Sequence, residues 1–279
     1  MFRRRTRPAP TEAVAWSRSR LLLLLGAAAA SALLLLGGLI AAGWYALNGS
    51  PADSGEPTAT DPAATPATDP DEVRDRIAAE PMLSVGRDAP YTPDPALTPA
   101  GVIEIPLPID GRGMAGVATG LPHTPEGAVA QLAAIEQQVL ETMSLPVARE
   151  VWQVWTLPGA PSFEQWELTL SVRSFLASAR QAGDTKDATT VVTATPAAAL
   201  IKGIDGPDWV LACVLLDVRA VVVTEARMGY GHCARMQWTE GRWQIAPGEA
   251  PATAPSTWPG STLAVEAGWL TWTTDERRG

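Results

Sequence analysis

The chain has 279 residues, a formal net charge of −9 and only two cysteines and two histidines. This length allows one or two domains with a sizeable core. An acidic chain with two lysines lacks the clustered positive charge of nucleic-acid-binding proteins. Two cysteines and two histidines exclude a four-cysteine zinc site and a three-histidine metal centre. We therefore expect no nucleic-acid partner, metal or cofactor.

The net charge is the sum of two unlike parts. Residues 1–20 hold six arginines and one glutamate, which leaves 15 basic and 29 acidic residues after them, a balance of −14. Residues 21–47 contain no charge over 27 positions, long enough for a helix that spans a bilayer. The arginines place residues 1–20 in the cytoplasm. The apolar run is longer than the apolar segment of a cleavable signal sequence, although Ala41 and Gly43 are small residues at which cleavage could occur. The sequence predicts a single-pass membrane protein with an extracytoplasmic C-terminal part.

A spacer and an irregular lead-in follow the predicted anchor. Residues 48–72 are rich in Pro, Thr and Ala and predict a disordered linker. Residues 73–120 predict an extended lead-in, with a short helix over 71–80 and a strand piece over 102–107, that wraps onto the main domain. Its Gly111–Gly116 run matches G-x-G-x-x-G. Because no helix pattern follows that run, it predicts a turned loop rather than a dinucleotide site.

Three helices are expected next. Thr124 is a suitable N-cap before Pro125, and the apolar stripe that follows has helical spacing: Ala128, Leu132, Ile135, Val139 and Met143. Pro146 opens a second helix, and residues 163–180 repeat the helical spacing a third time.

The hydrophobic period then changes to two residues. Strands are expected over 189–204, 209–223, 228–239 and 242–246, and the second is half-buried with Asp217 and Arg219 on its polar face. Glu240 and Gly241 predict a tight hairpin turn. Helices followed by antiparallel strands predict an α+β domain over residues 121–247, in which a curved sheet wraps its helices.

The two cysteines lie on successive predicted strands. Cys213 and Cys233 could be bonded in an oxidising compartment, or could be two buried free thiols. Direct pairing requires the turn to centre on Val223, whereas Glu225 and Ala226 give the better turn signal. A bulge would reconcile the two.

Two residues are pocket candidates. Asp217 and His232 could form an acid–base pair in a sheet cavity, although no third group is identifiable. A metal site at His232 and Cys233 would also need His123, which lies far away in sequence. Neighbours on one strand face opposite ways, which argues against a Cys–His nucleophile. We therefore expect no catalytic residues and no enzyme.

The tail, residues 248–279, shows no regular element but holds Trp258, Trp269 and Trp272. Such large apolar side chains predict that the tail docks on its own domain or on a partner.

Three runs carry a resemblance to a known family: Gly120–Ala130, Gly229–Ile245 and Gly268–Trp272. They resemble segments of membrane-anchored proteins of actinobacterial integrative and conjugative elements. That resemblance implies an NTF2-like extracytoplasmic domain, similar to the VirB8-type assembly subunits of type IV secretion systems. It implies a noncatalytic scaffold of a conjugation or transfer complex, with other envelope proteins or a second copy as partners. The alternative is an NTF2-like domain that binds or converts a small molecule in the cavity between helices and sheet.

Overall fold

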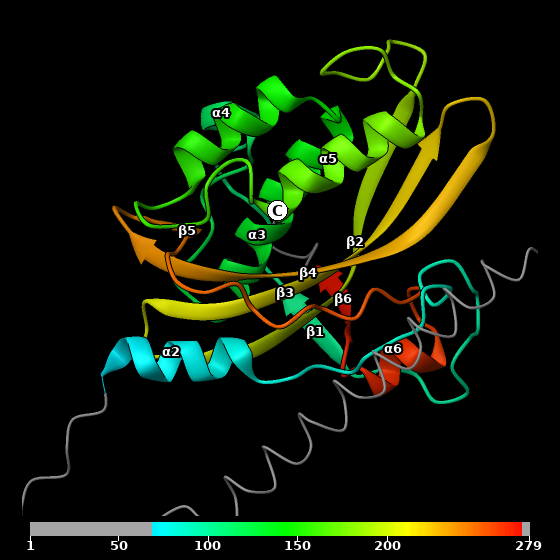
Figure 1. Ribbon diagram of the computed structural model, residues 1–279. Coiled ribbons are helices and arrows are strands. Elements are labelled where there is room, and N and C mark those ends of the chain that lie inside the picture. Colours follow the sequence, from blue (N-terminus) through cyan, green and yellow to red (C-terminus); the bar gives the residue numbers. More distant parts are fainter. Residues whose placement is uncertain (1–68, 275–279) are drawn as a thin grey trace, which may run out of the picture. The chain divides into compact units, whose positions relative to one another are not determined.

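The computed structural model describes residues 69–274 (Figure 1). The predicted cytoplasmic segment 1–20, the predicted membrane helix 21–47 and nearly all of the predicted linker lie outside these residues. Within the described part, no helix is long and apolar enough to cross a membrane. Helix α2 (Pro70–Ala79) begins inside the expected linker, because Asp69 caps it and Pro70 occupies its first turn. The folded part therefore begins before residue 72, the predicted end of the linker.

Three helices pack against one face of the sheet (Figure 1). Helix α3 (Pro125–Thr142) begins where expected, since the Thr124 hydroxyl accepts a hydrogen bond from the Gly127 amide at 3.1 Å. Its expected apolar stripe is buried. Helix α4 (Leu145–Trp155) is capped by Ser144. Helix α5 (Glu167–Ser178) is shorter at both ends than the expected 163–180.

The six strands form one sheet in the order β1-β6-β2-β3-β4-β5. The strands are β1 (Val102–Ile105), β2 (Val191–Ile204), β3 (Trp209–Val221), β4 (Glu225–Thr239), β5 (Arg242–Ile245) and β6 (Leu270–Thr274). Strands β2 to β5 are successive antiparallel neighbours, and register shifts near Pro196 and Ile201 interrupt the β2–β3 ladder. The long strands curl around α3 into a half-barrel (Figure 1). The predicted α+β class with a curved sheet is confirmed.

The lead-in and the tail are both part of this sheet. Strand β6 pairs in parallel with β1 and antiparallel with β2. The sheet therefore crosses both expected domain boundaries, at 120 and at 247. The expectation that the tail has no regular element is wrong, because it also forms α6 (Thr262–Glu266). A five-residue strand whose partners lie far away in sequence leaves little local pattern.

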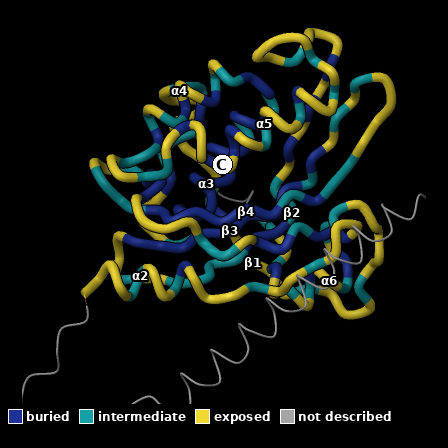
Figure 2. Tube along the Cα trace, in the orientation of Figure 1, coloured by how far each residue is buried: buried dark blue, intermediate teal, exposed yellow. Residues whose placement is uncertain are grey.

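Strand β3 is more deeply buried than expected. Its first eight residues, Trp209–Leu216, are buried on both faces, so the prediction of a half-buried strand is wrong for most of its length. One face packs on the helices. The other is covered by α2, the lead-in and the tail, and most of β3 is therefore coloured as buried in Figure 2. Met82 of the lead-in and Trp269 of the tail pack around Cys213 and Leu215. The outer layer therefore turns a two-layer domain into a three-layer one around β3.

Candidate functional site

An open cleft of about 820 Å³ separates α5 from the distal ends of β3 and β4. This size lies within the range of small-molecule sites. Most of its wall is apolar, with Leu170 and Phe175 from α5, Val218 and Ala220 from β3, Met228 from β4 and Val222 from the turn between these strands. The cleft exists because β3 and β4 extend past the helical layer before they turn at residues 222–224 (Figure 1).

One end of the cleft is polar. Glu167, the first residue of α5, lines it together with Ser171 one turn later and Tyr230 from β4. The Tyr230 hydroxyl lies 3.1 Å from the Ser171 hydroxyl. Burial and the nearby Glu167 charge raise the pKa of Tyr230 well above its ordinary value, so the phenol stays protonated. This end therefore presents two hydroxyls and one carboxylate to a ligand.

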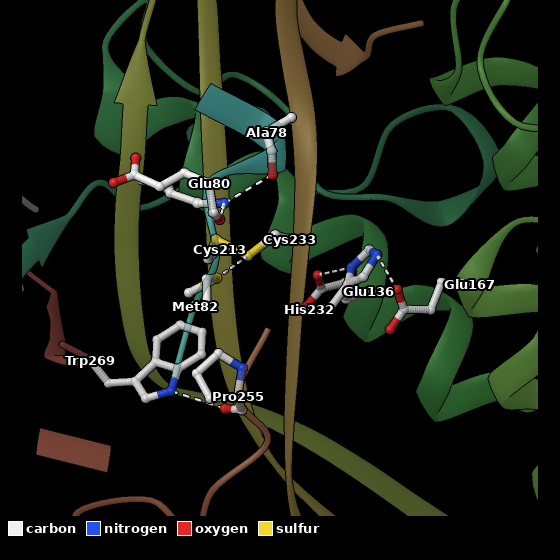
Figure 3. The surroundings of a disulfide bond; sticks show 11 residues. Ala78, Glu80, Met82, Glu136, Glu167, Cys213, His232, Cys233, Pro255 and Trp269 are labelled. Atoms are coloured by element: carbon white, nitrogen blue, oxygen red, sulfur yellow. Dashed lines mark hydrogen bonds and ion pairs between the residues drawn. A yellow bond between two sulfur atoms is a disulfide. The ribbon is translucent and has the colours of Figure 1, made fainter. Parts of the chain in front are cut away.

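A buried ion pair lies behind this polar end (Figure 3). His232 Nδ1 lies 2.7 Å from Glu136 Oε1, and the side chains of these residues are 5% and 0% exposed. On the other side of the ring, His232 Nε2 lies 3.7 Å from Glu167 Oε2, whose side chain is 56% exposed. The second oxygen of Glu136, Oε2, is buried without a hydrogen-bond partner. The three groups form a continuous path from the protein interior to the cleft wall.

The pKa values of both buried groups lie above their ordinary values, Glu136 because of burial and His232 because of its two carboxylate neighbours. Burial raises the pKa of Glu136 to about 7, although the hydrogen bond and charge of His232 oppose the shift. Burial alone would lower the pKa of His232, but the Glu167 charge and the hydrogen bond to Glu136 outweigh it and raise that pKa to about 9. The imidazole is therefore protonated at neutral pH. The cluster can hold a proton next to a ligand site.

The two carboxylates contact opposite nitrogens of one imidazole, so they cannot converge on a common ion. Within residues 69–274, no group of three or more His, Cys, Asp and Glu side chains is arranged to hold a metal ion. The Gly111–Gly116 run forms a loop with a short 3-10 turn at Met114–Gly116 and leads into no α-helix. It lacks the strand-turn-helix setting of a dinucleotide site.

The predicted pairing of Asp217 with His232 is not formed. His232 pairs in register with Val214, three residues from Asp217, and positions three apart in a strand face opposite sides. Asp217 instead binds Arg227 through two contacts of 2.7 and 2.8 Å, and Arg219 at 3.3 Å. Burial acts to raise the pKa of Asp217, but the hydrogen bonds and charges of the arginines outweigh burial and lower it. Asp217 is a structural ion-pair residue.

Cys213 and Cys233 form a disulfide. They are directly opposite each other in the β3–β4 ladder, which runs in unbroken register to a turn at 222–224. Of the two alternatives, the bonded form is therefore the one observed. The turn signal at Glu225 and Ala226 was misleading, because both residues lie in β4, and no bulge is needed.

Four polar site residues were missed by the sequence reasoning: Glu136, Glu167, Ser171 and Tyr230. Glu136 follows Leu132 by four residues, so it lies next to the apolar stripe of α3, where an acidic side chain is unusual. That signal was available. Glu167 and Tyr230 lie on ordinary polar positions of a helix and a strand, and only the fold brings them together. His123, which lies far in sequence from His232, stacks on Trp238 and pairs with Asp208 at 2.7 Å.

Comparison of the chain with protein-family models, with curated proteins and with solved structures finds no match in any of the three.

Proposed function

We propose that this protein is a noncatalytic, single-pass membrane protein whose extracytoplasmic domain is NTF2-like and helps to assemble a conjugation or transfer complex in the cell envelope. The order of helices followed by a curled antiparallel sheet supports the NTF2-like assignment. The charge-free run 21–47 after six arginines supports the membrane anchor. The Cys213–Cys233 disulfide supports a location outside the cytoplasm, where such bonds persist.

One observation carries the assembly role: the lead-in exposes large aliphatic side chains although it is part of the folded domain. They are Leu97, Leu107, Ile109 and Met114, and Leu97 and Ile109 are 102% and 83% exposed. Exposed apolar side chains concentrated on one segment are typical of contact surfaces. This exposure supports residues 97–114 as the proposed contact surface for an envelope partner.

Site-specific photo-crosslinking in the native host tests this role. A photoreactive amino acid at position 109 is expected to give covalent adducts with another envelope protein or a second copy. The same group at Glu164, an exposed residue of the loop before α5, is the control and is expected to give none. Recovery of only the monomer from position 109, with envelope complexes preserved, would contradict the assembly role.

The cleft favours a second candidate function, the binding of a small molecule. Its apolar walls end in Glu167, Ser171 and Tyr230, the combination of apolar surface and few polar groups typical of ligand sites. The sequence has three tyrosines, and two of them, Tyr91 and Tyr230, line the cleft. Fluorine NMR of the full chain labelled with 3-fluorotyrosine in lipid nanodiscs therefore reports on the cleft with few signals.

A ligand in the cleft is expected to shift the Tyr230 signal, which is assigned by its loss in Tyr230→Phe. Addition of hexanol, an apolar probe with one hydroxyl, tests for binding. A narrower cleft, made by Ala220→Phe, is expected to abolish the shift. If hexanol leaves the Tyr230 signal unchanged at millimolar concentration, the cleft is not a ligand site.

A further inference from the structure

The charges in the cleft are unevenly distributed along α5. Glu167 begins this helix, and Arg180 lies two residues past its end. Thirteen residues separate them, or about 20 Å at the rise of an α-helix. The third charged lining residue, Arg227, is already bound to Asp217 and lies over the ring of Trp258. The charges free to meet a ligand are therefore acidic at one end and basic at the other.

The acidic end holds two carboxylates and one imidazole. With His232 protonated, Glu136 and Glu167 leave the cluster with one net negative charge, or none when Glu136 takes up a proton. Glu136 Oε2 has no hydrogen-bond partner, so the negative charge there is not fully compensated. While Glu136 is ionised, the cluster repels an anion and attracts a cation.

The walls between the two ends are apolar, which strengthens this attraction. Leu170, Phe175, Val218 and Met228 line the cleft that Glu167 borders, so apolar surface replaces part of the water near this carboxylate, whose side chain is 56% exposed. A charge pair is worth more where few water molecules screen it. Tyr230 adds an aromatic ring beside the carboxylate, and aromatic faces also attract cations.

We propose that the cleft binds an amphipathic amine, with its ammonium group at Glu167, Ser171 and Tyr230 and its apolar body along the walls between α5 and the β3–β4 hairpin. This inference rests on the second candidate function, the binding of a small molecule in the cleft. Glu167 accepts two hydrogen bonds from the ammonium, and the Tyr230 and Ser171 hydroxyl oxygens accept the third. The apolar body extends toward Arg180 and the hairpin turn.

Three probes of equal chain length test the charge preference: hexylamine, hexanol and hexanoate at pH 7. Binding to the full chain in nanodiscs is followed by the Tyr230 fluorine signal. Hexylamine is expected to bind about tenfold more tightly than hexanol, as a charge-assisted contact at a partly buried site predicts. Hexanoate is expected to bind more weakly than hexanol.

Glu167→Gln is expected to remove the preference for hexylamine over hexanol, and a shift of its Tyr230 signal on addition of hexanol shows that the variant is folded. Glu164→Gln is the matched control, since Glu164 is an exposed acid outside the cleft that pairs with Arg149 at 3.5 Å. It is expected to leave all three affinities unchanged.

Each other outcome overturns the inference in a distinct way. Equal affinity for the three probes means that the cleft selects only apolar bulk. Tighter binding of hexanoate, lost in Arg180→Gln, means that the basic end selects the ligand. If no probe shifts the Tyr230 signal, the small-molecule function fails together with the inference.

Discussion

His232 and Cys233 are consecutive residues of β4, yet their side chains lie on opposite faces of the sheet (Figure 3). The imidazole of His232 faces α3, where it contacts Glu136 at 2.7 Å. The sulfur of Cys233 faces the outer layer, where it is bonded to Cys213 and lies near Met82. The alternation of side chains along a strand therefore separates the proton-holding cluster from the crosslink. Substitutions at the two neighbours are expected to have independent effects.

The disulfide is expected to stabilise the domain. It closes a loop with a sequence separation of 20 residues. The Cys213→Ala/Cys233→Ala variant is expected to lose about 3 kcal/mol of unfolding free energy, because the uncrosslinked unfolded chain gains entropy. Urea denaturation under non-reducing conditions measures the loss. The wild-type chain with a strong reductant should resemble the variant, and an unchanged midpoint in both would contradict the prediction.

Removal of one member of the buried ion pair is expected to destabilise the fold strongly. His232→Leu leaves Glu136 fully buried without its one hydrogen-bond partner. The expected loss is about 3–5 kcal/mol of unfolding free energy, the usual cost of an uncompensated buried charge.

The double variant Glu136→Leu/His232→Leu separates pairing from packing. It is expected to be more stable than His232→Leu, because no charge is then left buried. Urea unfolding of the wild type, both single variants and the double variant completes the cycle. Additive losses at the two positions would show that the pair is not coupled.

The free energy of unfolding is expected to fall as the pH rises from about 5 to about 9. Glu136 has an ordinary pKa of 4.5 and a folded value of about 7. His232 has an ordinary pKa of 6.5 and a folded value of about 9. Between pH values of about 5 and about 9, the folded protein therefore binds more protons than the unfolded chain. The stabilisation is therefore present at low pH and is lost as the pH rises through each folded pKa.

Urea midpoints measured across this pH range test the dependence. The Glu136→Gln/His232→Gln variant is expected to show a flatter profile than the wild type. His123→Gln, which removes the other histidine without touching the cluster, serves as the control. Parallel profiles for the wild type and the double variant would assign the pH dependence to other groups.

Gly229 is expected to be essential for docking of the tail. A Cβ atom at this position would lie 1.8 Å from the carbonyl oxygen of Thr257, which is fully buried. Gly229→Ala must therefore displace residues 255–259, with a loss of at least about 2 kcal/mol of unfolding free energy. Limited proteolysis is expected to cut this segment faster in the variant. Gly183→Ala, where nothing lies within 4 Å, is the control, and equal cleavage of both variants would argue against a close approach.

Local patterns were sufficient for much of the fold. The stripe after Thr124 predicted α3, and the change to a period of two predicted the long strands. The Glu240–Gly241 turn is confirmed, since both residues have positive φ and join β4 to β5. These features depend on residues close together in the chain, so the amino-acid order specifies them directly.

The outer layer of the domain and the candidate site could not be predicted from local sequence patterns. Strand β6 depends on β1 and β2, whose residues are distant in sequence, and the burial of β3 depends on segments at both ends of the domain. Asp217 and His232 looked like partners because both are polar residues of adjacent strands. The register of β3 and β4 places them on opposite faces, a fact that residue types alone do not contain.

The sequence by itself therefore determined the division into a basic start, a charge-free run and an acidic remainder. It also determined the helices and the long strands, because these elements depend on residues that are neighbours in the chain. Only the tertiary structure decided that Glu136, His232 and Glu167 form one cluster below an apolar cleft and that the two cysteines are bonded. The physical reason is that strand register and helix docking, which act over long distances in the chain, determine which side chains share a space.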